Sequence, residues 1–302
     1  MQAPADPEAS LAAIAARLRA AGCVFAEEEA QLLWQAAPSD AILRDMVERR
    51  AAGLPVEHLV GWAEFCGLRV EVGPGVFVPR RRSELLVRRA AELARPGDVV
   101  IDLACGSGAI GLAIAARVPG LELHACDLSP EAVRLARRNL AGIGAHVHAG
   151  DLYAPLPARL RGQVAVIAAN VPYVPTEAVA MMPPEARDYE PLLALDGGHD
   201  GLDVLRRAAA EAPVWLAPQG HLLIEAASGQ AERASEVLAA AGLEPSVASD
   251  PELGATVLIA RRQGPGVNDV TIPQQLALRP RQDRELIRIA ALDWERAVRR
   301  TQ

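Results

Sequence analysis

The chain contains no lysine: all 31 of its basic residues are arginines. We attribute this to the base composition of the source rather than to chemistry. Aromatic side chains make up only 3% of the 302 residues, whereas hydrophobic residues make up 51%. The chain can therefore bury a sizeable core made mainly of Ala, Val, Leu and Ile. Its length allows one medium catalytic domain and a smaller attachment.

Cysteine is also scarce, and its spacing is uninformative. The four cysteines are widely separated and form no C-x-x-C pair; they are Cys23, Cys66, Cys105 and Cys126. This pattern argues against a disulfide framework and against a zinc site. We therefore predict no metal site and a reducing compartment.

Long apolar runs are absent from the sequence. No stretch approaches the ~20 apolar residues that a membrane helix needs, and residues 1–17 lack the basic start and apolar run of a signal peptide. We predict a cytoplasmic protein. The formal net charge of −7 provides no global attraction to phosphates, which argues against a nucleic-acid partner.

Hydrophobic periodicity divides the chain into four parts. Residues 1–60 follow a helical period and are predicted to form a small helical domain. Residues 61–82 are predicted to form a β-hairpin linker that turns at Gly73-Pro74-Gly75. Residues 83–263 are predicted to form the catalytic domain, and residues 264–302 a tail with one helix.

Helix boundaries are marked by capping residues in several places. Asp6 precedes Pro7 at the start of the first predicted helix, and Ser39 begins the third, which Gly53 ends. In the tail, Gly264-Pro265-Gly266 indicates a linker before a helix at about 281–300.

From residue 83 onward, apolar strands alternate with helices. This alternation is typical of an α/β fold whose mostly parallel sheet carries helices on both faces. The last two strands lie close enough in sequence to pair antiparallel. The predicted strands cover residues 98–104, 121–127, 145–148, 163–169, 220–226, 244–249 and 254–261.

The first chemical motif is the glycine-rich turn after the first sheet strand, at residues 104–108. Glycine lets a backbone approach a ligand closely, and open α/β sheets bind ligands at the carboxyl ends of their strands. Gly106, Gly108 and Gly111 also match the dinucleotide pattern G-x-G-x-x-G, so the spacing alone does not exclude NAD.

Asp127 is the second motif, at the end of the next strand and about 20 residues past the glycines. A carboxylate in this place can accept hydrogen bonds from the two hydroxyls of a ribose. The alternative is that Asp127 only opens the helix beginning at Pro130, and the two roles can coexist.

The third motif, Asn170-Val171-Pro172-Tyr173, ends the fourth strand. The Asn170 side-chain carbonyl and a backbone carbonyl of the rigid turn could accept both N–H groups of a planar NH2. Tyr173 could stack on that plane or wall the pocket. An ordinary exit from a strand has the same composition, so the motif alone leaves both readings open.

Together these motifs resemble the HemK/PrmC family, which methylates the side-chain amide of glutamine in peptide release factors. The resemblance covers about residues 40–260, and residues 170–173 correspond to the family signature Asn-Pro-Pro-Tyr. Further matching segments are 61–68, 78–80, 190–198, 200–203, 216–220 and 224–225, with Gln230 after them.

The resemblance implies a class I methyltransferase dependent on S-adenosylmethionine. Its fold would be a Rossmann-like seven-stranded sheet with the last strand antiparallel, behind a small helical domain that docks the substrate. The resemblance implies that the partner is a protein substrate such as a peptide chain release factor, and that the enzyme is a monomer. The implied catalytic residues are Asn170, Val171, Pro172 and Tyr173; the implied cofactor-binding residues are Asp102, Ala104, Cys105, Gly106, Ser107, Gly108, Asp127, Leu128, Asp151, Leu152 and Asn170.

The sequence departs from the family pattern at several positions. Val171 replaces the first proline of the signature but keeps the main-chain carbonyl. Ala104 replaces a usual glycine, and Ala226 a usual Ile or Val. Residues 79–84 lose one proline and gain charge. The helical domain is also shorter than the family's, around residues 36–40.

Some polar groups near these motifs have no assigned role. Arg80 to Arg82 could bind the cofactor carboxylate or an acidic partner, or form a solvated face. No general base is evident; His199 and Asp200 lie in a loop that could approach the site.

Other functions remain open at this point. A methyltransferase for an exocyclic amine of DNA or RNA would use a related turn, because adenine also presents a planar NH2. A small-molecule methyltransferase, a dehydrogenase and a degenerate, non-catalytic S-adenosylmethionine-binding module are further alternatives.

Overall fold

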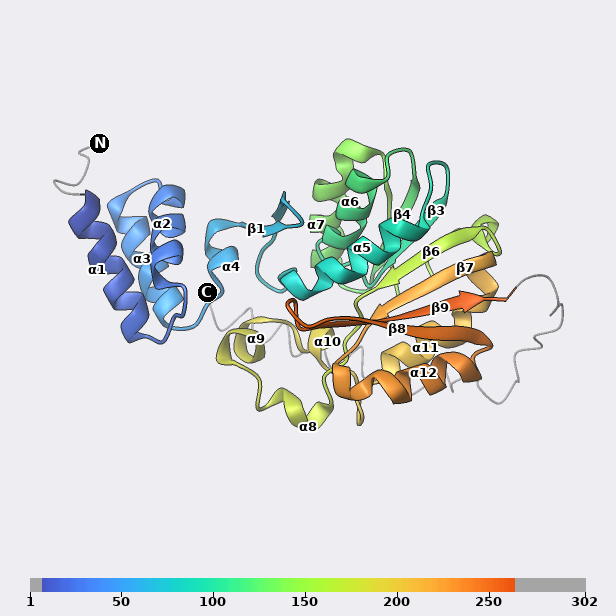
Figure 1. Cartoon of the computed structure of the whole chain (residues 1–302). Coiled ribbons are helices and arrows are strands. Elements are labelled where there is room, and N and C mark those ends of the chain that lie inside the picture. The colour runs from blue at the N-terminus through green and yellow to red at the C-terminus, as the bar shows by residue number, and fades with distance from the viewer. Residues whose placement is uncertain (1–6, 264–302) are drawn as a thin grey trace. The chain divides into compact units, whose positions relative to one another are not determined.

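A computed structural model describes residues 7–263 of the chain (Figure 1). The predicted cap Asp6, the linker at 264–266 and the tail helix at about 281–300 lie outside the described residues.

Helices come first in the described chain, a hairpin follows, and the remainder alternates strands with helices. The N-terminal elements are α1 (Pro7–Ala20), α2 (Ala26–Ala36), α3 (Asp40–Ala51), α4 (Val56–Val60), β1 (Trp62–Phe65) and β2 (Leu68–Glu71). The strands of the large sheet are β3 (Val99–Leu103), β4 (Glu122–Asp127), β5 (His146–Ala149), β6 (Val164–Ala169), β7 (Leu216–Glu225), β8 (Leu243–Asp250) and β9 (Ala255–Arg262). The α-helices of this part are α5 (Glu84–Leu93), α6 (Ala109–Arg117), α7 (Pro130–Leu140), α8 (Thr176–Val179), α9 (Pro184–Tyr189), α10 (Leu192–Leu195), α11 (Asp203–Trp215) and α12 (Ala231–Ala240). Its 3₁₀ turns are η1 (Arg81–Ser83), η2 (Ala141–Ile143), η3 (Ala158–Leu160) and η4 (Ser228–Gln230).

The seven strands form one sheet in the order β5-β4-β3-β6-β7-β9-β8. Strands β3 to β7 are mutually parallel, whereas β9 runs antiparallel to both β7 and β8. This confirms the predicted α/β sheet with an antiparallel last strand. The chain reverses its direction of progress across the sheet between β3 and β6, and ligands bind at such a switch point.

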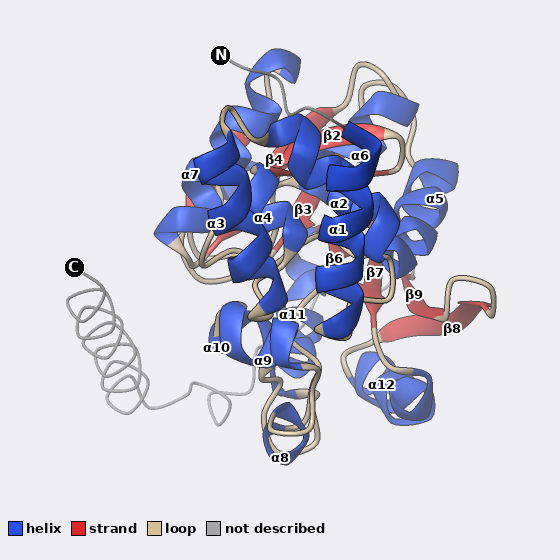
Figure 2. Ribbon diagram, turned by 90° about the vertical axis from the view of Figure 1, so that its left-hand side faces the viewer, coloured by secondary structure: helices blue, strands red, loops and turns tan. Residues whose placement is uncertain are grey.

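The sheet lies between helices (Figure 2), and an apolar layer of side chains packs against each of its faces. One face packs against α5, α6 and α7 through side chains such as Leu86, Ile114 and Leu140. The other face packs against α11, α12 and the segment after β5, where Tyr153 and Trp215 stack with ring centroids 5.7 Å apart. Strands buried on both faces need continuous apolar sequence, as residues 164–169 have.

The helical domain has a core of its own, formed by residues of α1 to α4 such as Leu18, Leu33 and Met46. Ser39 caps α3 as predicted, because its Oγ accepts the backbone N–H of Ile42. Gly53, with φ of 103°, follows the end of α3 in a conformation that favours glycine.

The predicted hairpin exists, but its turn was placed wrongly. Strands β1 and β2 are joined by Cys66 and Gly67, whose φ angles are 55° and 76°. Two successive residues with positive φ are typical of the type I′ turn that closes a two-residue hairpin. Residues 73–75 therefore follow the hairpin, and 76–78 form no strand. Within the described chain no helix is long and apolar enough to cross a membrane.

Candidate active site

The turn after β3 forms one wall of the site. Residues Ala104, Gly106 and Gly108 have φ angles of 56°, 55° and 79°, so the backbone passes three times through the left-handed region. A Cβ added to Gly106 would meet no atom within 4 Å, which shows that the protein leaves space open beside this residue. Ala104 adopts this conformation although it carries a Cβ, at a cost of about 1 kcal/mol.

Asp102 lies beneath this turn rather than beside the ligand space. It is fully buried, and its Oδ2 accepts the backbone N–H of Gly111 at 2.8 Å. A Cβ on Gly111 would lie 3.0 Å from that oxygen, so the third glycine of the motif serves this contact. Burial raises the pKa of Asp102 to about 8, with a smaller contribution from Asp127. The carboxyl supports the turn in a mainly neutral form at neutral pH.

Asp127 ends β4 and faces the turn. Its Oδ2 accepts the N–H of Gly106, and its Oδ1 that of Ser129, both at 2.8 Å. Each carboxylate oxygen retains a lone pair for a ribose hydroxyl. Burial raises the pKa of this carboxyl, and the backbone N–H donors oppose the rise. The cap of α7 is Ser129, whose Oγ accepts the N–H of Ala132, so capping does not consume Asp127.

A cavity of about 420 Å³ joins this wall to the end of β6. That volume lies in the usual range for small-molecule and cofactor sites. Asp102 and Gly108 do not line the cavity. The other residues implied for cofactor or substrate all do: Ala104, Cys105, Gly106, Ser107, Asp127, Leu128, Asp151, Leu152, Asn170, Val171, Pro172 and Tyr173. Leu152 also has a positive φ, 43°, which places a second strained residue at the cavity.

Asn170 is held by a relay of hydrogen bonds that begins at Glu225, at the end of the neighbouring strand β7. The Ser83 hydroxyl donates to Glu225 Oε2 at 2.6 Å, and Asn170 Nδ2 donates to Ser83 Oγ at 3.2 Å. Because the Ser83 proton is committed to a carboxylate, its oxygen can only accept from Asn170. The relay therefore fixes which way the Asn170 amide faces. Among residues 7–263, none donates a hydrogen bond to Asn170 Oδ1 or to the carbonyl oxygen of Val171.

Glu225 organises this side of the cavity from the end of β7. Its side chain is 1% exposed, and its Oε1 accepts from Arg82 Nε and from the Tyr173 hydroxyl, each at 3.0 Å. Burial raises the pKa of Tyr173, and the charge of Glu225 raises it further. The Tyr173 hydroxyl is thus neutral and donates to Glu225, and the Tyr173 ring lines the cavity.

The segment at 196–201 buttresses the turn that follows Asn170. Gln230 Nε2 donates to the carbonyls of Tyr173 and Asp200, at 2.9 and 3.1 Å. A Cβ on Gly201 would lie 2.3 Å from the Tyr173 carbonyl oxygen, and one on Gly197 would lie 2.7 Å from that of Pro172. Only glycine fits at these two positions, which explains Gly197 and Gly201 in the matching segments 190–198 and 200–203.

Two of the three arginines at 80–82 pair with buried carboxylates, whereas Arg81 is exposed to solvent. Arg80 pairs with the buried Glu190 at 2.6 Å, and Arg82 pairs with the buried Glu225. Glu190 also accepts the N–H of Val78. Both arginines line the cavity and therefore neutralise buried carboxylates there, Glu190 in its lining and Glu225 behind Tyr173.

The loop residues considered as a base are not positioned for that role. His199 is exposed and does not line the cavity. Asp200 is paired with Arg206 at 2.6 Å, and this hydrogen bond holds the pKa of Asp200 below its usual range.

The helical domain contacts the cavity wall directly. The buried Arg50 guanidinium donates to Glu29 within the helical domain and to Glu185 in α9, at 2.6 Å each. The Tyr189 hydroxyl donates to the carbonyl of Ala52 at 3.0 Å. Glu185 lines the cavity, so these contacts connect the two parts.

Three residues of this arrangement had no role assigned from the sequence. Glu225 and Gln230 belonged to matching segments, and Ser83 to a departure from the family pattern. Glu225 had a usable signal: like Asp127, it is an acid that ends a buried apolar strand, here Leu222 to Ile224. Ser83 had none, because its partners are 87 and 142 residues away in sequence.

Comparisons with known proteins agree with this geometry. The methyltransferase small domain matches residues 67–182. The release factor glutamine methyltransferase of Streptomyces coelicolor is 42% identical over 63% of this chain and 69% of its own length. That of Bradyrhizobium diazoefficiens is 34% identical over 78% of this chain and 87% of its own.

The chain belongs to the release factor glutamine methyltransferase family. A methyltransferase from Pyrococcus furiosus, 18% identical, has a similar fold over 65% of this chain and 90% of its own, with a TM-score of 0.50. The cofactor of this enzyme family is S-adenosylmethionine. The open space beside Gly106, the cavity volume and the free lone pairs of Asp127 fit a nucleoside-bearing ligand of this kind.

Proposed function

We propose that this chain transfers a methyl group from S-adenosylmethionine to the side-chain amide nitrogen of a glutamine in a peptide chain release factor. The observation that carries the proposal is the fixed orientation of the Asn170 amide in the lining of the cavity. Membership of the family supports the target. Residues 104–108 with Asp127 would hold the cofactor, and Asn170 with the turn after it would hold the substrate amide.

An amide nitrogen is a weak nucleophile, because its lone pair is delocalised into the carbonyl. S-adenosylmethionine supplies an electrophilic methyl group on a sulfonium. The task of the chain is to hold the nitrogen about 3–3.5 Å from that carbon and in line with the bond that breaks. Two acceptors on the NH2 group would do this and support positive charge on nitrogen as it develops.

Asn170 Oδ1 and the Val171 carbonyl are the two acceptors. Each has no partner among the described residues, and each can accept one N–H of a planar NH2. If the Asn170 amide were rotated by half a turn, its NH2 would face the substrate NH2 and repel it. The Ser83–Glu225 relay prevents that rotation, so we assign Ser83 and Glu225 as positioning residues.

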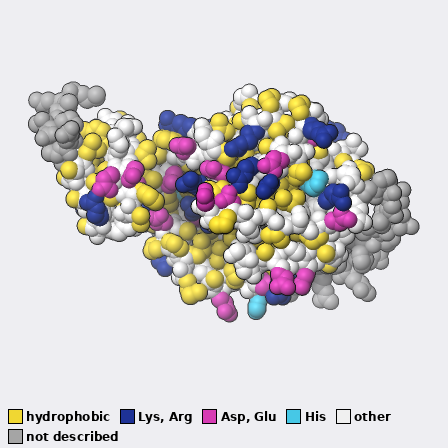
Figure 3. Space-filling model, in the orientation of Figure 1, with side chains coloured by type: hydrophobic (Ala, Val, Ile, Leu, Met, Phe, Trp, Pro, Cys, Tyr) yellow, Lys and Arg dark blue, Asp and Glu magenta, His cyan; other side chains and the backbone are white. Residues whose placement is uncertain are grey.

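A protein substrate is supported by the surface beside the cavity. Met181, Leu192 and Leu193 are 82%, 60% and 56% exposed, and Figure 3 shows hydrophobic side chains gathered over α8 to α10. Leu193 also lines the cavity. Large apolar side chains at a cavity mouth suit a macromolecular partner better than a small polar molecule. The cytoplasmic location and the monomeric state remain predictions.

The runner-up is a methyltransferase for an exocyclic amine of a nucleic acid, which needs the same two acceptors. The pairing of Arg80 and Arg82 with buried carboxylates counts against it, because these cations next to the site are already neutralised and offer little to a phosphate backbone.

The deciding experiment incubates the purified protein with methyl-labelled S-adenosylmethionine and the release factor of its source, followed by peptide mass mapping. We expect one methyl group on the side-chain amide of one glutamine. The matched substrate control changes that glutamine to glutamate, and the matched enzyme control is Asn170→Ala. Label on nucleic acid in a parallel incubation, with none on the release factor, would replace the proposal by the runner-up.

A further inference from the structure

Three of the six histidines of the chain gather on one face of β4 and β5, and none of the three lines the cavity. Glu122 and His124 are two residues apart on β4, and His146 and His148 are two residues apart on β5. Side chains two residues apart on a strand share a face. His124 and His146 are register partners, so the parallel pairing brings all four side chains together.

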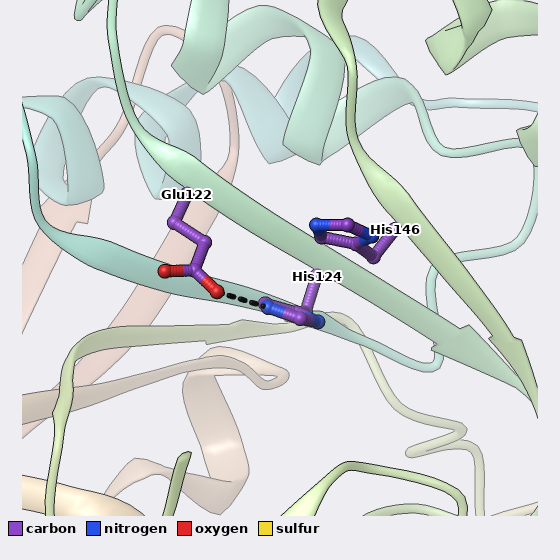
Figure 4. A group of neighbouring side chains, drawn as sticks. All are labelled: Glu122, His124 and His146. Carbon is purple, nitrogen blue, oxygen red and sulfur yellow. Dashed lines mark hydrogen bonds and ion pairs between the residues drawn. The ribbon is translucent and has the colours of Figure 1, made fainter. Parts of the chain in front are cut away.

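The contacts within this cluster converge on His124, which is 1% exposed. Its Nε2 lies 3.0 Å from Glu122 Oε1, and its Nδ1 lies 2.9 Å from His148 Nε2. The His124 ring stacks on those of His146 and His148, with centroids 4.8 and 5.2 Å apart. Figure 4 shows Glu122, His124 and the exposed His146 side by side.

One donor atom from each of Glu122, His124 and His146 lies within 4.8 Å of the other two. Two imidazole nitrogens and a carboxylate oxygen form a set that suits Zn²⁺ and similar divalent ions. Neutral imidazoles have the free lone pair that a metal requires.

We propose that Glu122, His124 and His146 bind one divalent transition-metal ion of the Zn²⁺ type, with His148 supporting His124. Bonds of about 2.0–2.1 Å in a tetrahedron separate two ligand atoms by about 3.3 Å. The 3.0 Å between Glu122 Oε1 and His124 Nε2 is already close to that edge. His146 is exposed and can turn to supply the third ligand, and water completes the shell.

Binding changes the tautomer of the two inner histidines, His124 and His148. In the arrangement with neutral rings, His124 Nε2–H donates to Glu122 and His148 Nε2–H donates to His124 Nδ1. When the ion takes the Glu122–His124 position, the proton of His124 sits on Nδ1 and donates to His148, whose own proton moves to Nδ1. No net proton is released. A metal-bound histidine that donates its other N–H in this way is well oriented and more basic.

Arg159 would compete with a bound cation for the Glu122 carboxylate. Its Nη1 lies 2.8 Å from the same Glu122 oxygen that faces His124. Its side chain is 58% exposed, so it can withdraw into solvent when a cation arrives. Removal of this charge should therefore raise metal affinity, an effect opposite in sign to the loss of a ligand.

The consequence of metal binding concerns the edge of the sheet. Strand β5 has four residues and pairs with β4 alone. An ion bound by residues of both strands would link β5 to β4 and stabilise this short edge strand. His124 precedes Asp127 by three residues, about 10 Å along the strand. The metal site would therefore lie on the same strand as Asp127 but outside the cofactor-binding residues.

The test uses the full-length, untagged protein after treatment with a chelator. Titration with Co²⁺, followed by its visible absorption, and with Zn²⁺, followed by calorimetry, should show one equivalent bound. Zn²⁺ should also raise the melting temperature by several degrees through preferential binding to the folded state. His146→Ala should weaken binding at least tenfold, and Arg159→Gln should strengthen it.

His221→Ala is the matched control, because His221 lies on β7 outside the cluster and its loss should leave binding unchanged. His146 is exposed, so its variant should fold normally, as its melting temperature without metal would show. The proposal is overturned if no equivalent binds below about 1 mM, if His146→Ala binds like the wild type, or if the Co²⁺ spectrum shows thiolate ligation at a cysteine. None of these outcomes bears on methyl transfer, which is measured separately.

Discussion

The two halves of the cavity are built by different means. The cofactor half, residues 104–108 with Asp127, consists mostly of backbone in left-handed conformations and of hydrogen bonds between adjacent strand ends. The acceptor half, residues 170–173 with Ser83 and Glu225, depends on side chains joined across 87 and 142 residues of sequence. Local conformation thus determines where the cofactor sits, whereas long-range contacts determine how the acceptor is oriented.

The largest expected effect separates the two halves directly. Asn170→Ala should lower kcat about 10²–10³-fold, the usual cost of losing one preorganised polar partner, and leave cofactor affinity nearly unchanged. Asp127→Ala should raise the Kd of the cofactor about 10–100-fold, for the loss of hydrogen bonds to a charged group, and lower kcat less at saturating cofactor.

Calorimetric titration of S-adenosylmethionine and initial rates check this pair of variants. The Asp127→Asn variant serves as a control that keeps one acceptor oxygen. Equal losses of affinity and of kcat in both variants would show that the two halves do not act separately.

A smaller effect tests the relay inside the acceptor half. Ser83→Ala should lower kcat about tenfold, because Asn170 loses the partner that fixes its amide, and such a hydrogen bond contributes about 1–1.5 kcal/mol. The cofactor Kd should not change. Ser83→Thr retains a hydroxyl and should recover most of the activity. A merely structural role would instead lower the melting temperature of Ser83→Ala while kcat of the folded fraction stayed normal.

The pH dependence of stability tests the cofactor half. Burial raises the pKa of Asp102 to about 8 in the folded protein, against an ordinary value of 3.8 for aspartate. Between these values the folded state binds more protons than the unfolded state, so the stability contributed by this group is lost as pH rises toward 8. Asp102→Asn resembles the neutral form and should flatten that decline. Urea unfolding at several pH values measures it, and an unchanged slope would contradict the assignment.

The smallest effect concerns strain in the glycine-rich turn. Ala104 has a φ of 56°, so Ala104→Gly should relieve strain and stabilise the folded state by at most about 1 kcal/mol, less the greater entropy of glycine in the unfolded chain. Thermal unfolding would show a rise of a few degrees at most, with cofactor affinity preserved. A clear loss of stability would mean that the Ala104 methyl packs favourably enough to outweigh the strain.

Sequence-based prediction succeeded where the signal was local. The sheet strands were placed to within a few residues, except that β7 begins at Leu216 rather than at residue 220. The hairpin turn was misplaced because Gly73-Pro74-Gly75 is a stronger turn pattern than Cys66-Gly67. The short helices α8 to α10 were not predicted, because helices of four to six residues leave little periodicity to detect.

The sequence by itself determined the parallel sheet, the glycine-rich turn and the strand-end positions of Asp127 and Asn170, because periodicity and turn chemistry act over a few residues. Tertiary structure alone decided that Asp102 supports the turn from below, that Arg80 and Arg82 neutralise buried carboxylates, and that Ser83 orients Asn170. These roles depend on which distant segments meet when the helices close on the sheet. Burial then makes each unpaired polar group costly enough to require its particular partner.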